Sequence, residues 1–333
     1  MAALDPGLPI DLTMILVAGS ANLDFVVRAS HIPAPGETVL GQTFHTYPGG
    51  KGANQAVASA RAGGATTHML LALGDDAYAL PLEASLGAAG VQLHTVRTAG
   101  VATGTAFICV SDEAENAITV APGANNTLSA EHLPTLDGFS HLLMQLETPL
   151  ATVTAYAREA RTRGVKVVLN AAPAQPLGAE LLALTDILIV NEGELASIAN
   201  HQGSVAQCLE RVHVPTVVVT LGAQGCCVRS GSSFLLQPSF AVTPVDTTGA
   251  GDTFCGVLVA ALSEGNSMPA AMRRAAAAAA LACTQSGAQS SIPTRDAVSA
   301  FLHTQTATTA HQENQLREFC GLPPTLESTS PTA

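Results

Sequence analysis

The chain has 333 residues and 47% of them are hydrophobic, which is enough for a sizeable core in one large domain or two modest ones. Its formal net charge is −12, with 14 Lys and Arg residues against 26 Asp and Glu residues. This excess of acidic side chains argues against a nucleic-acid partner and against a membrane partner, because both carry negative charge.

The cysteines and the first residues indicate a cytoplasmic protein. Seven cysteines are scattered without C-x-x-C spacing, which fits reduced, buried thiols better than disulfides or a zinc site. Residues 1–13 are acidic and contain prolines, unlike a secretion signal, and no run of about 18 apolar residues follows. We treat residues 1–13 as an N-terminal extension.

Short apolar runs alternate with helix-like stretches along most of the chain. The runs are Ile15–Gly19, Met69–Leu73, Leu142–Leu146, Val165–Leu169, Ile187–Val190 and Val217–Leu221, and the helix-like stretches include Ala53–Ala62, Leu150–Arg163 and Gly193–Ala199. This alternation predicts a largely parallel sheet with helices on both faces. We expect an α/β fold with a Rossmann-like, three-layer α/β/α core over residues 14–304.

Two segments, about 22–46 and 100–121, interrupt this alternation. Thr103–Val110 and Asn116–Ala121 are rich in strand-forming residues and flank the polar turn Ser111–Glu115, which is typical of a hairpin. We expect the two segments to form a small inserted antiparallel sheet that covers a cleft as a lid.

The end of the chain has a different composition. Residues 305–333 are rich in Thr, Gln, Ser and Pro and lack hydrophobic periodicity, which predicts a flexible C-terminal tail.

The segment from Asp246 to Phe254, with the sequence DTTGAGDTF, carries the sharpest chemical signal. Small residues that open a helix leave unpaired N–H groups at its positive end, which is an anion site. Gly249 and Gly251 let the backbone approach a phosphate closely. By itself, Asp252 fits an ordinary helix-capping role. The second acid, Asp246, and the glycines between favour a catalytic role.

A glycine cluster at Gly49–Gly52 precedes a helix and lacks the Walker-type spacing of a phosphate loop. It fits a tight turn with close helix packing. Lys51 and Asn54 are three residues apart at the helix start, so they can face one side and donate to sugar hydroxyls.

Polar residues also follow several predicted strands, where open parallel sheets bind ligands. Asn22 and Asp24 follow the first strand, and Glu147 closes the strand Leu142–Leu146. Asn191 and Glu194 present an amide and a carboxylate on one side of a helix start, which suits a hydrated magnesium ion or, equally, a simple N-cap. The turn from Thr220 to Gly225 could pass beneath phosphates, or be a plain glycine turn.

These segments, in this order, resemble the ribokinase branch of the pfkB-type carbohydrate kinase family. Asp246–Phe254 is similar to the family's C-terminal signature, and Gly49–Gly64 to its N-terminal one. Pro35–Thr38, Gly50–Asn54 and Met144–Glu147 are similar to the ribokinase branch itself. The resemblance runs from about Ile15 to Leu302.

The resemblance implies transfer of the ATP γ-phosphoryl group to O5 of D-ribose, giving D-ribose 5-phosphate and ADP. It implies that Asp252 is the catalytic base and that the backbone of Gly249, Ala250 and Gly251 forms the anion hole. The implied sugar contacts are Asn22, Asp24, Gly50, Lys51, Asn54, Glu147 and Asp252. The implied contacts to ATP and its Mg²⁺ are Asn191, Glu194, Thr220, Gly222, Gly225 and Gly251. The implied site for an activating K⁺-like ion comprises Asp246, Thr248, Ala282, Gln285, Gly287 and Ser291.

The resemblance also implies homodimers that pair through their lid sheets. One departure is the segment Leu169–Pro173, which reads Leu-Asn-Ala-Ala-Pro where the branch usually has Asn-Pro-Ala-Pro.

A kinase for 2-deoxyribose, another sugar or a nucleoside remains an alternative. Aromatic residues make up 4% of the chain and Trp is absent, which favours a bare sugar over a nucleoside. A non-catalytic sugar- or nucleotide-binding regulator on the same fold is a further alternative, and Asp252 with its glycines argues against it.

Overall fold

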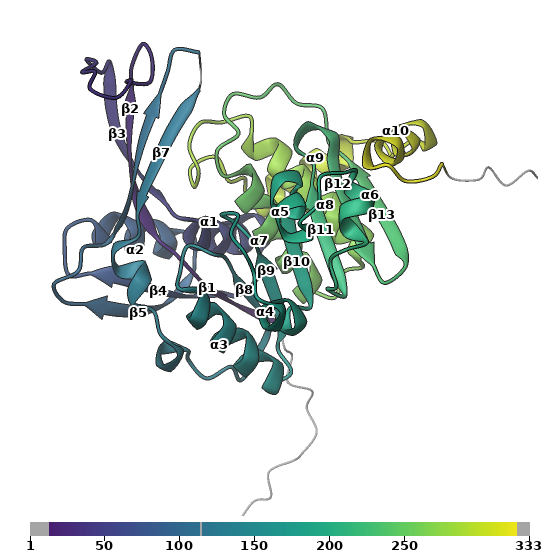
Figure 1. Cartoon of the computed structure of the whole chain (residues 1–333), viewed down its shortest axis with the longest axis horizontal. Coiled ribbons are helices and arrows are strands. Elements are labelled where there is room, and N and C mark those ends of the chain that lie inside the picture. Colours follow the sequence, from purple (N-terminus) through teal and green to yellow (C-terminus); the bar gives the residue numbers. More distant parts are fainter. Residues whose placement is uncertain (1–12, 114, 325–333) are drawn as a thin grey trace, which may run out of the picture.

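The computed structural model describes residues 13–113 and 115–324, and its core is a nine-stranded sheet of order β13-β12-β11-β10-β9-β8-β1-β4-β5 (Figure 1). The strands are β1 (Met14–Ala18), β4 (Thr67–Gly74), β5 (Gln92–Thr98), β8 (Phe139–Met144), β9 (Lys166–Asn170), β10 (Ile187–Asn191), β11 (Thr216–Thr220), β12 (Gly225–Ser230) and β13 (Ser233–Pro238). Neighbours pair in parallel except β11–β12 and β12–β13, which are antiparallel. The predicted parallel-dominated α/β fold is confirmed.

Helices cover both faces of this sheet because successive strand residues point to opposite sides. Ile15 and Val17 of β1 belong to one apolar core, and Leu16 and Ala18 to the other. The first core is covered by α1 (Lys51–Val57), the π-helical segment η1 (Ala58–Ala62), α2 (Ala79–Ala88), α7 (Ala250–Ser263), α8 (Met268–Ala282) and α9 (Arg295–Thr304). The second is covered by α3 (Leu150–Thr162), α4 (Ala179–Leu184), α5 (Glu192–Ala199), α6 (Val205–Leu209) and α10 (Ala310–Cys320).

The segments expected to form a lid make a separate four-stranded sheet of order β3-β2-β6-β7 that rises from one side of the core, and we call it the lid sheet or lid (Figure 1). Its strands are β2 (Asn22–Arg28), β3 (Thr43–Gly49), β6 (Gly104–Val110) and β7 (Asn116–Ala121). Each outer pair is antiparallel, and the central strands β2 and β6 pair in parallel, with Leu23 opposite Thr105. Phe25 of β2 stacks on Phe107 of β6 and meets the edge of Tyr78, so the lid packs against the start of α2.

The prediction of a flexible tail over residues 305–333 is wrong for Ala310–Cys320, which forms α10. The Thr309 side chain accepts a hydrogen bond from Gln312 N at its start, and Gly321 ends it with a φ of +74°. Leu316 and Cys320 lie four residues apart, on one face, and are buried in the second core. With few apolar positions, this helix has a weak sequence signal. Residues 1–12 and 325–333, including most of the expected N-terminal extension, lie outside the described residues.

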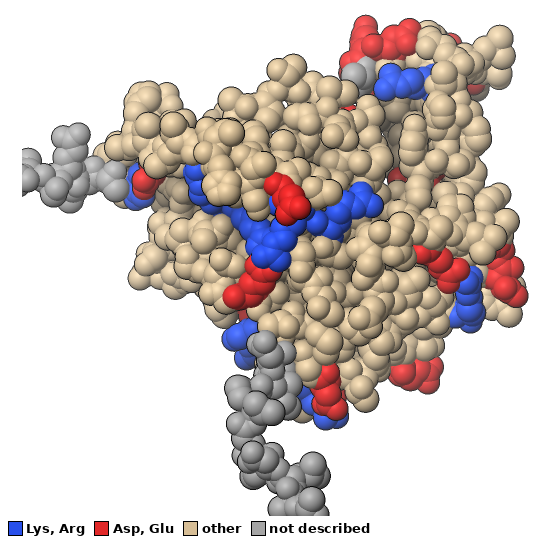
Figure 2. Space-filling view, turned by 180° about the vertical axis from the view of Figure 1, so that it is seen from behind, with Lys and Arg blue, Asp and Glu red and all other residues tan. Residues whose placement is uncertain are grey.

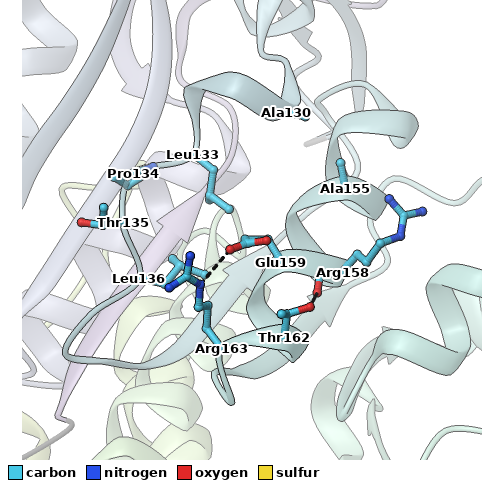
Figure 3. A pocket seen from close by; sticks show the side chains of 10 residues that line it. All are labelled: Ala130, Leu133, Pro134, Thr135, Leu136, Ala155, Arg158, Glu159, Thr162 and Arg163. Atoms are coloured by element: carbon cyan, nitrogen blue, oxygen red, sulfur yellow. Dashed lines mark hydrogen bonds and ion pairs between the residues drawn. The ribbon is translucent and has the colours of Figure 1, made fainter.

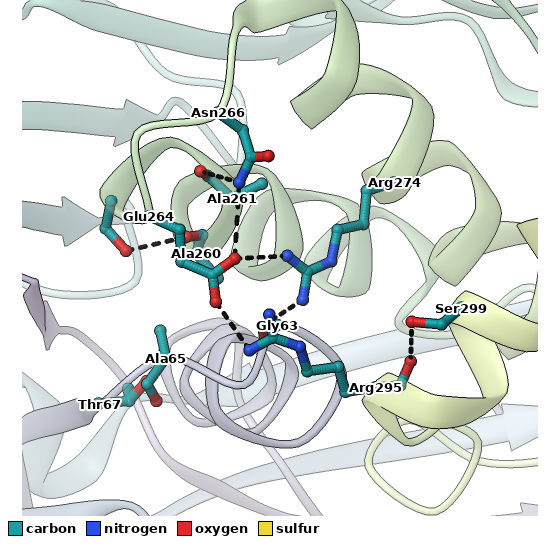
Figure 4. Close-up of polar contacts among 11 residues, drawn as sticks. Gly63, Ala65, Thr67, Ala260, Ala261, Glu264, Asn266, Arg274, Arg295 and Ser299 are labelled. Carbon is teal, nitrogen blue, oxygen red and sulfur yellow. Dashed lines mark hydrogen bonds and ion pairs between the residues drawn. The ribbon is translucent and has the colours of Figure 1, made fainter.

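A network of charged side chains joins α7, α8 and α9 to one another (Figure 4). Glu264, at the end of α7, accepts hydrogen bonds from Arg274 Nη1 at 2.7 Å and Arg295 Nη1 at 2.8 Å. Arg274 Nη2 also donates to the carbonyl oxygen of Gly63 at 2.5 Å, just after η1. The network therefore joins α7, α8 and α9 to the end of η1. Figure 2, seen from behind, shows positive and negative side chains lying next to one another at several places on that side of the molecule.

The described residues contain no helix that is both long and apolar enough to span a bilayer.

Candidate active site

A polar cavity of about 160 Å³ lies where strands β9, β10 and β11 end and helix α7 begins. The carboxyl ends of parallel strands are where such sheets bind ligands. The cavity is lined by Lys51, Asn170, Ala172, Ile189, Asn191, Glu194, Thr220, Gly249, Gly251, Asp252 and Cys255. The wall of this cavity therefore brings together candidate site residues that are far apart in the sequence, such as Lys51 and Asp252.

The start of α7 supplies unpaired backbone donors to this cavity. Gly249 has a φ of +74°, and a Cβ there would lie 3.1 Å from Ala288 Cα, so glycine suits both the turn and the close approach. The N–H of Ala250 donates to Thr247 O at 3.2 Å, and that of Thr253 to Gly249 O at 2.8 Å. The N–H groups of Gly251 and Asp252 donate to no acceptor within residues 13–113 and 115–324. Free N–H groups at the positive end of a helix are suited to binding an anion.

The carboxylate of Asp252 is held by two neighbouring side chains of α1. Asn54 Nδ2 donates to its Oδ2 at 3.0 Å, and Gln55 Nε2 donates to its Oδ1 at 2.9 Å. No side-chain cap hydrogen bond is present at the start of α7. Asp252 thus lies in the first turn of α7, as the helix-stabilising alternative allows, but its side chain makes no cap hydrogen bond and is directed toward α1.

Three buried amide side chains to which the sequence assigned no role complete this arrangement. Gln145 Nε2 donates to Gln55 Oε1 at 2.6 Å, and Gln55 Nε2 donates to Asn170 Oδ1 at 2.9 Å. Asn170 Nδ2 in turn donates to Ile189 O at 3.1 Å. The sequence could have pointed to them, because each is a polar residue in an apolar stretch. Gln55 follows Asn54, Gln145 lies two residues before Glu147, and Asn170 ends β9.

A cluster of acidic side chains and one lysine adjoins the cavity on the lid side. Glu147 Oε2 accepts from Ser20 Oγ at 2.5 Å and from the backbone N–H of Lys51 at 3.1 Å. Burial, followed by the negative charges of Glu147 and Asp252, raises the pKa of Asp24 to about 7. Burial lowers the pKa of Lys51, but the charges of Asp252, Glu147 and other acids outweigh it and leave the pKa raised.

The structure places Asn22 and Gly50 at the base of the lid and outside the cavity wall. Asn22 is 2% exposed, and its Oδ1 accepts from Asn125 Nδ2 at 2.7 Å. Gly50 has a φ of +90°, and a Cβ there would lie 2.7 Å from Asn22 N. Asn125, which the sequence analysis did not mention, also bonds the N–H and the carbonyl of Ala21 and so fixes this corner.

Asn191 and Glu194 form a capping box at the start of α5. The N–H of Glu194 donates to Asn191 Oδ1, and the N–H of Asn191 donates to Glu194 Oε2, both at 2.8 Å. This is the capping role that the sequence left open, and both residues nevertheless line the cavity. Burial raises the pKa of Glu194 against the opposing effects of the Asn191 N–H and Lys51. Glu194 Oε1 accepts no hydrogen bond from the described residues.

The turn after β11 contributes one residue to the cavity, and its glycines serve the local backbone. Thr220 lines the cavity and donates to Val190 O at 3.3 Å. Gly225 has a φ of +117°, and a Cβ there would lie 2.1 Å from Gln237 O, so the β12–β13 hairpin requires glycine. Gly222 and Gly225 are not part of the cavity wall.

The predicted monovalent-cation residues surround one loop junction. Asp246 Oδ1 accepts from Thr248 N, and its Oδ2 accepts from Gly287 N, both at 2.9 Å. Burial raises the pKa of Asp246, but the hydrogen bonds from Gly287 and Thr248 outweigh it and leave the pKa lowered. Ala282 ends α8, and Gln285, Gly287 and Ser291 lie in the following loop. The described residues contain no cluster of three His, Cys, Asp or Glu side chains suited to a metal, so a cation here would depend on carbonyl oxygens beside Asp246.

A larger hollow of about 480 Å³ lies on the outer side of α3 (Figure 3). Its charged residues are Arg158, Glu159 and Arg163, and Arg163 Nε pairs with Glu159 Oε1 at 2.9 Å. Arg158 pairs with Glu180 outside the hollow. No reactive group converges there, so the smaller cavity is the candidate active site.

Comparison with known proteins gives consistent similarities. Residues 12–295 match the pfkB family of carbohydrate kinases. The chain is 42% identical over 301 residues to the ribokinase of Haemophilus influenzae, covering 86% of this chain and 98% of that protein. It is 39% identical over 293 residues to the ribokinase of Bacillus subtilis, covering 86% of this chain and 99% of that protein.

Solved structures agree with the sequence similarities. The crystal structure of Thermotoga maritima ribokinase superimposes with a TM-score of 0.81 at 36% identity, covering 87% of this chain and 99% of that chain. Arabidopsis thaliana ribokinase, complexed with ribose and ATP, gives a TM-score of 0.80 at 32% identity and covers 88% of this chain and 99% of that chain.

Proposed function

The chain belongs to the pfkB family of carbohydrate kinases, and we propose that it transfers the γ-phosphoryl group of ATP to O5 of D-ribose, giving D-ribose 5-phosphate and ADP. The relatives named ribokinase, and the Arabidopsis structure with ribose and ATP, support this substrate pair. The observation that carries the proposal is the position of Asp252. Its carboxylate is held by two amide donors, directly beside the free N–H groups at the start of α7.

In the proposed mechanism, Asp252 accepts the proton of the sugar 5-hydroxyl as that oxygen attacks the γ-phosphorus. A positioned base of this kind contributes about 10²–10⁴ in rate. The backbone N–H groups around Gly249, Ala250 and Gly251 stabilise the charge of the moving phosphoryl group. Those of Gly249, Gly251 and Asp252 donate to no acceptor within the described residues, whereas that of Ala250 bonds to Thr247 O.

The sugar contacts combine acceptors with donors. Asp24 and Glu147 offer carboxylate oxygens to hydroxyl groups, and Lys51 and Asn54 offer N–H donors. Asn22 and Gly50 support the same corner of the lid through their buried contacts. A polyol needs several such groups close together. Lys51 and Asp252 line the cavity, and the charge of Glu147 acts on Lys51 from nearby, which supports a shared sugar site.

We assign the ATP side to Asn191, Glu194 and the Thr220–Gly225 turn. Glu194 keeps one carboxylate oxygen for a hydrated magnesium ion, which takes few protein ligands. When bound, Mg²⁺ neutralises charge on the β- and γ-phosphate oxygens. A K⁺-like activator would be held by Asp246 with the surrounding carbonyl oxygens, next to the start of α7.

Exposed apolar side chains on the small sheet support homodimer formation through this sheet. Phe44 is 58% exposed, Phe107 54% and Ile118 55%, which is unusual for large apolar side chains of one small sheet. The seven cysteines are free in the described structure, which supports a reducing, cytoplasmic location.

The test is ATP consumption by wild type and Asp252→Asn with ribose, 2-deoxyribose, fructose and adenosine, with and without K⁺. We expect ribose to be the preferred acceptor, K⁺ to raise turnover, and Asp252→Asn to lose about 10²–10⁴ in kcat while remaining folded. Asp296→Asn, an exposed acid in the first turn of α9, is the matched control and keeps wild-type turnover. A fully active Asp252→Asn enzyme would remove Asp252 as base, and preference for another acceptor would remove ribose as substrate.

A further inference from the structure

We propose that Gln55 is a positioning residue for Asp252, and that Gln145 and Asn170 act through Gln55 by fixing the direction of its amide group. This inference rests on the proposed role of Asp252 as base. Gln55 does not line the cavity, so it acts on the reaction only through the carboxylate that it holds.

The direction of each amide follows from the carboxylate. Ionised Asp252 can only accept hydrogen bonds, so Gln55 must present Nε2 to it. Gln55 Oε1 then faces Gln145, which must present its own Nε2, at 2.6 Å. The second N–H of Gln55 reaches Asn170 Oδ1 at 2.9 Å, which leaves Asn170 Nδ2 to donate to Ile189 O. The three amides therefore form one chain whose polarity is set by the base.

This polarity leaves a buried oxygen without a partner at the end of the chain, and the Oδ1 of Asn54, which also donates to Asp252, is a second one. Gln145 is 0% exposed, and its Oε1 accepts no hydrogen bond from the described residues. Turning the Gln145 amide around would place two oxygens against each other, Gln145 Oε1 and Gln55 Oε1. An unsatisfied buried acceptor is unfavourable and rare. Functional sites are where such exceptions are expected, because a buried polar atom can be left unpaired there to keep a catalytic group in place.

The backbone beside Gln145 leaves room for its amide group. A Cβ on Gly19, at the end of β1, would lie 2.0 Å from Gln145 Oε1. Glycine at this position therefore makes room for the unpartnered oxygen. Gln55 is likewise 0% exposed, so neither amide can exchange its protein partner for bulk water.

Two adjacent residues of α1 thus fix both oxygens of the base. Asn54 bonds Oδ2 and Gln55 bonds Oδ1, which prevents the carboxylate from rotating about its last bond. A base must be oriented toward the proton that it accepts, and small misplacements reduce turnover strongly. Asn54 is also a proposed sugar contact. Substitution of Gln55 therefore tests the positioning of the base without removing a sugar contact.

The experiment compares Gln55→Met, Gln145→Met and the double variant, measuring kcat and KM for ribose and for ATP. We expect kcat to fall about 100-fold for Gln55→Met and about 10-fold for Gln145→Met, with both KM values within about three-fold of wild type. Because Gln145 acts through Gln55, the double variant should lose no more kcat than Gln55→Met alone. The control is Thr152→Val in α3, which removes a buried hydrogen bond from the Thr152 side chain to Leu128 O. We expect its kcat to be unchanged.

The outcomes separate this inference from the proposed function. If the losses of the two single variants multiply in the double variant, or if KM changes instead of kcat, the proposed positioning of Asp252 through Gln55 and Gln145 (the relay) is overturned even though Asp252→Asn is inactive. An active Asp252→Asn enzyme would overturn the proposed base itself. Gln145→Met also removes the unpartnered oxygen, so it remains informative if Gln55→Met fails to fold, and wild-type kcat in that variant refutes the relay.

Discussion

Replacing Asp24 by Asn should stabilise the unliganded protein, by an amount that grows as the pH rises from about 4 to about 7. The carboxyl group is half-buried, and this partial burial, followed by the negative charges of Glu147 and Asp252, raises its pKa from 3.8 to about 7. Between these values the folded state binds more protons than the unfolded state, so this group makes the folded protein less stable as the pH rises.

The magnitude follows from the pKa difference. One pKa unit corresponds to about 1.36 kcal/mol, and the difference is about three units, so the penalty at pH 8 is about 4 kcal/mol at most. Relaxation of the side chain toward solvent lowers this figure. Asp24→Asn keeps the shape and removes the charge. It should therefore recover most of the penalty at pH 8 and almost none at pH 4, while raising KM for the sugar.

Urea denaturation of wild type and Asp24→Asn at pH 4.5, 6 and 8 measures this difference. The control is Asp76→Asn, whose effect should have the opposite sign. Burial raises the pKa of Asp76, but the hydrogen bonds from Thr103 and Tyr78 outweigh it and leave the pKa lowered. Asp76 therefore stabilises the folded state above its unfolded pKa, and this contribution is lost as the pH falls. A free-energy difference for Asp24→Asn that does not change with pH would refute the reasoning.

Three further substitutions test separate parts of the structure. Gly249→Ala forces a side chain into a positive φ and toward Ala288, so thermal denaturation should show a loss of about 1–2 kcal/mol, and kcat should fall. Glu264→Ala removes two hydrogen bonds to arginine and should lower the free energy of unfolding by about 1–3 kcal/mol, with unchanged kcat. Leu316→Ala should cost about 2–4 kcal/mol in urea denaturation, and no change there would mean that α10 is not docked.

The layered fold and the strand-end positions of the site were predictable because both are local patterns. Apolar runs that end in a polar residue identify the ends of parallel strands, and Asn191 and Thr220 indeed close β10 and β11 at the cavity. The Asp246–Phe254 segment likewise shows its helix start through its own glycines.

The amide chain was not predictable, because its partners are far apart in sequence. Gln55 meets Gln145 across 90 positions and Asp252 across 197, and no spacing rule relates them. Helix α10 escaped prediction for a different reason. Its stability comes from packing two side chains onto an existing core, and the composition of the segment alone resembles that of a linker.

The parallel pairing at the centre of the lid has a consequence for folding. Parallel neighbours cannot be joined by a tight turn, and the connection from β2 to β6 here runs through α1, β4, α2 and β5 of the core. Each hairpin can form locally, but their junction has a high contact order, so we expect it to form after this part of the core has assembled. A newly made chain would thus assemble helix α1, which carries Lys51 and Asn54, before the two hairpins of the small sheet pair with each other.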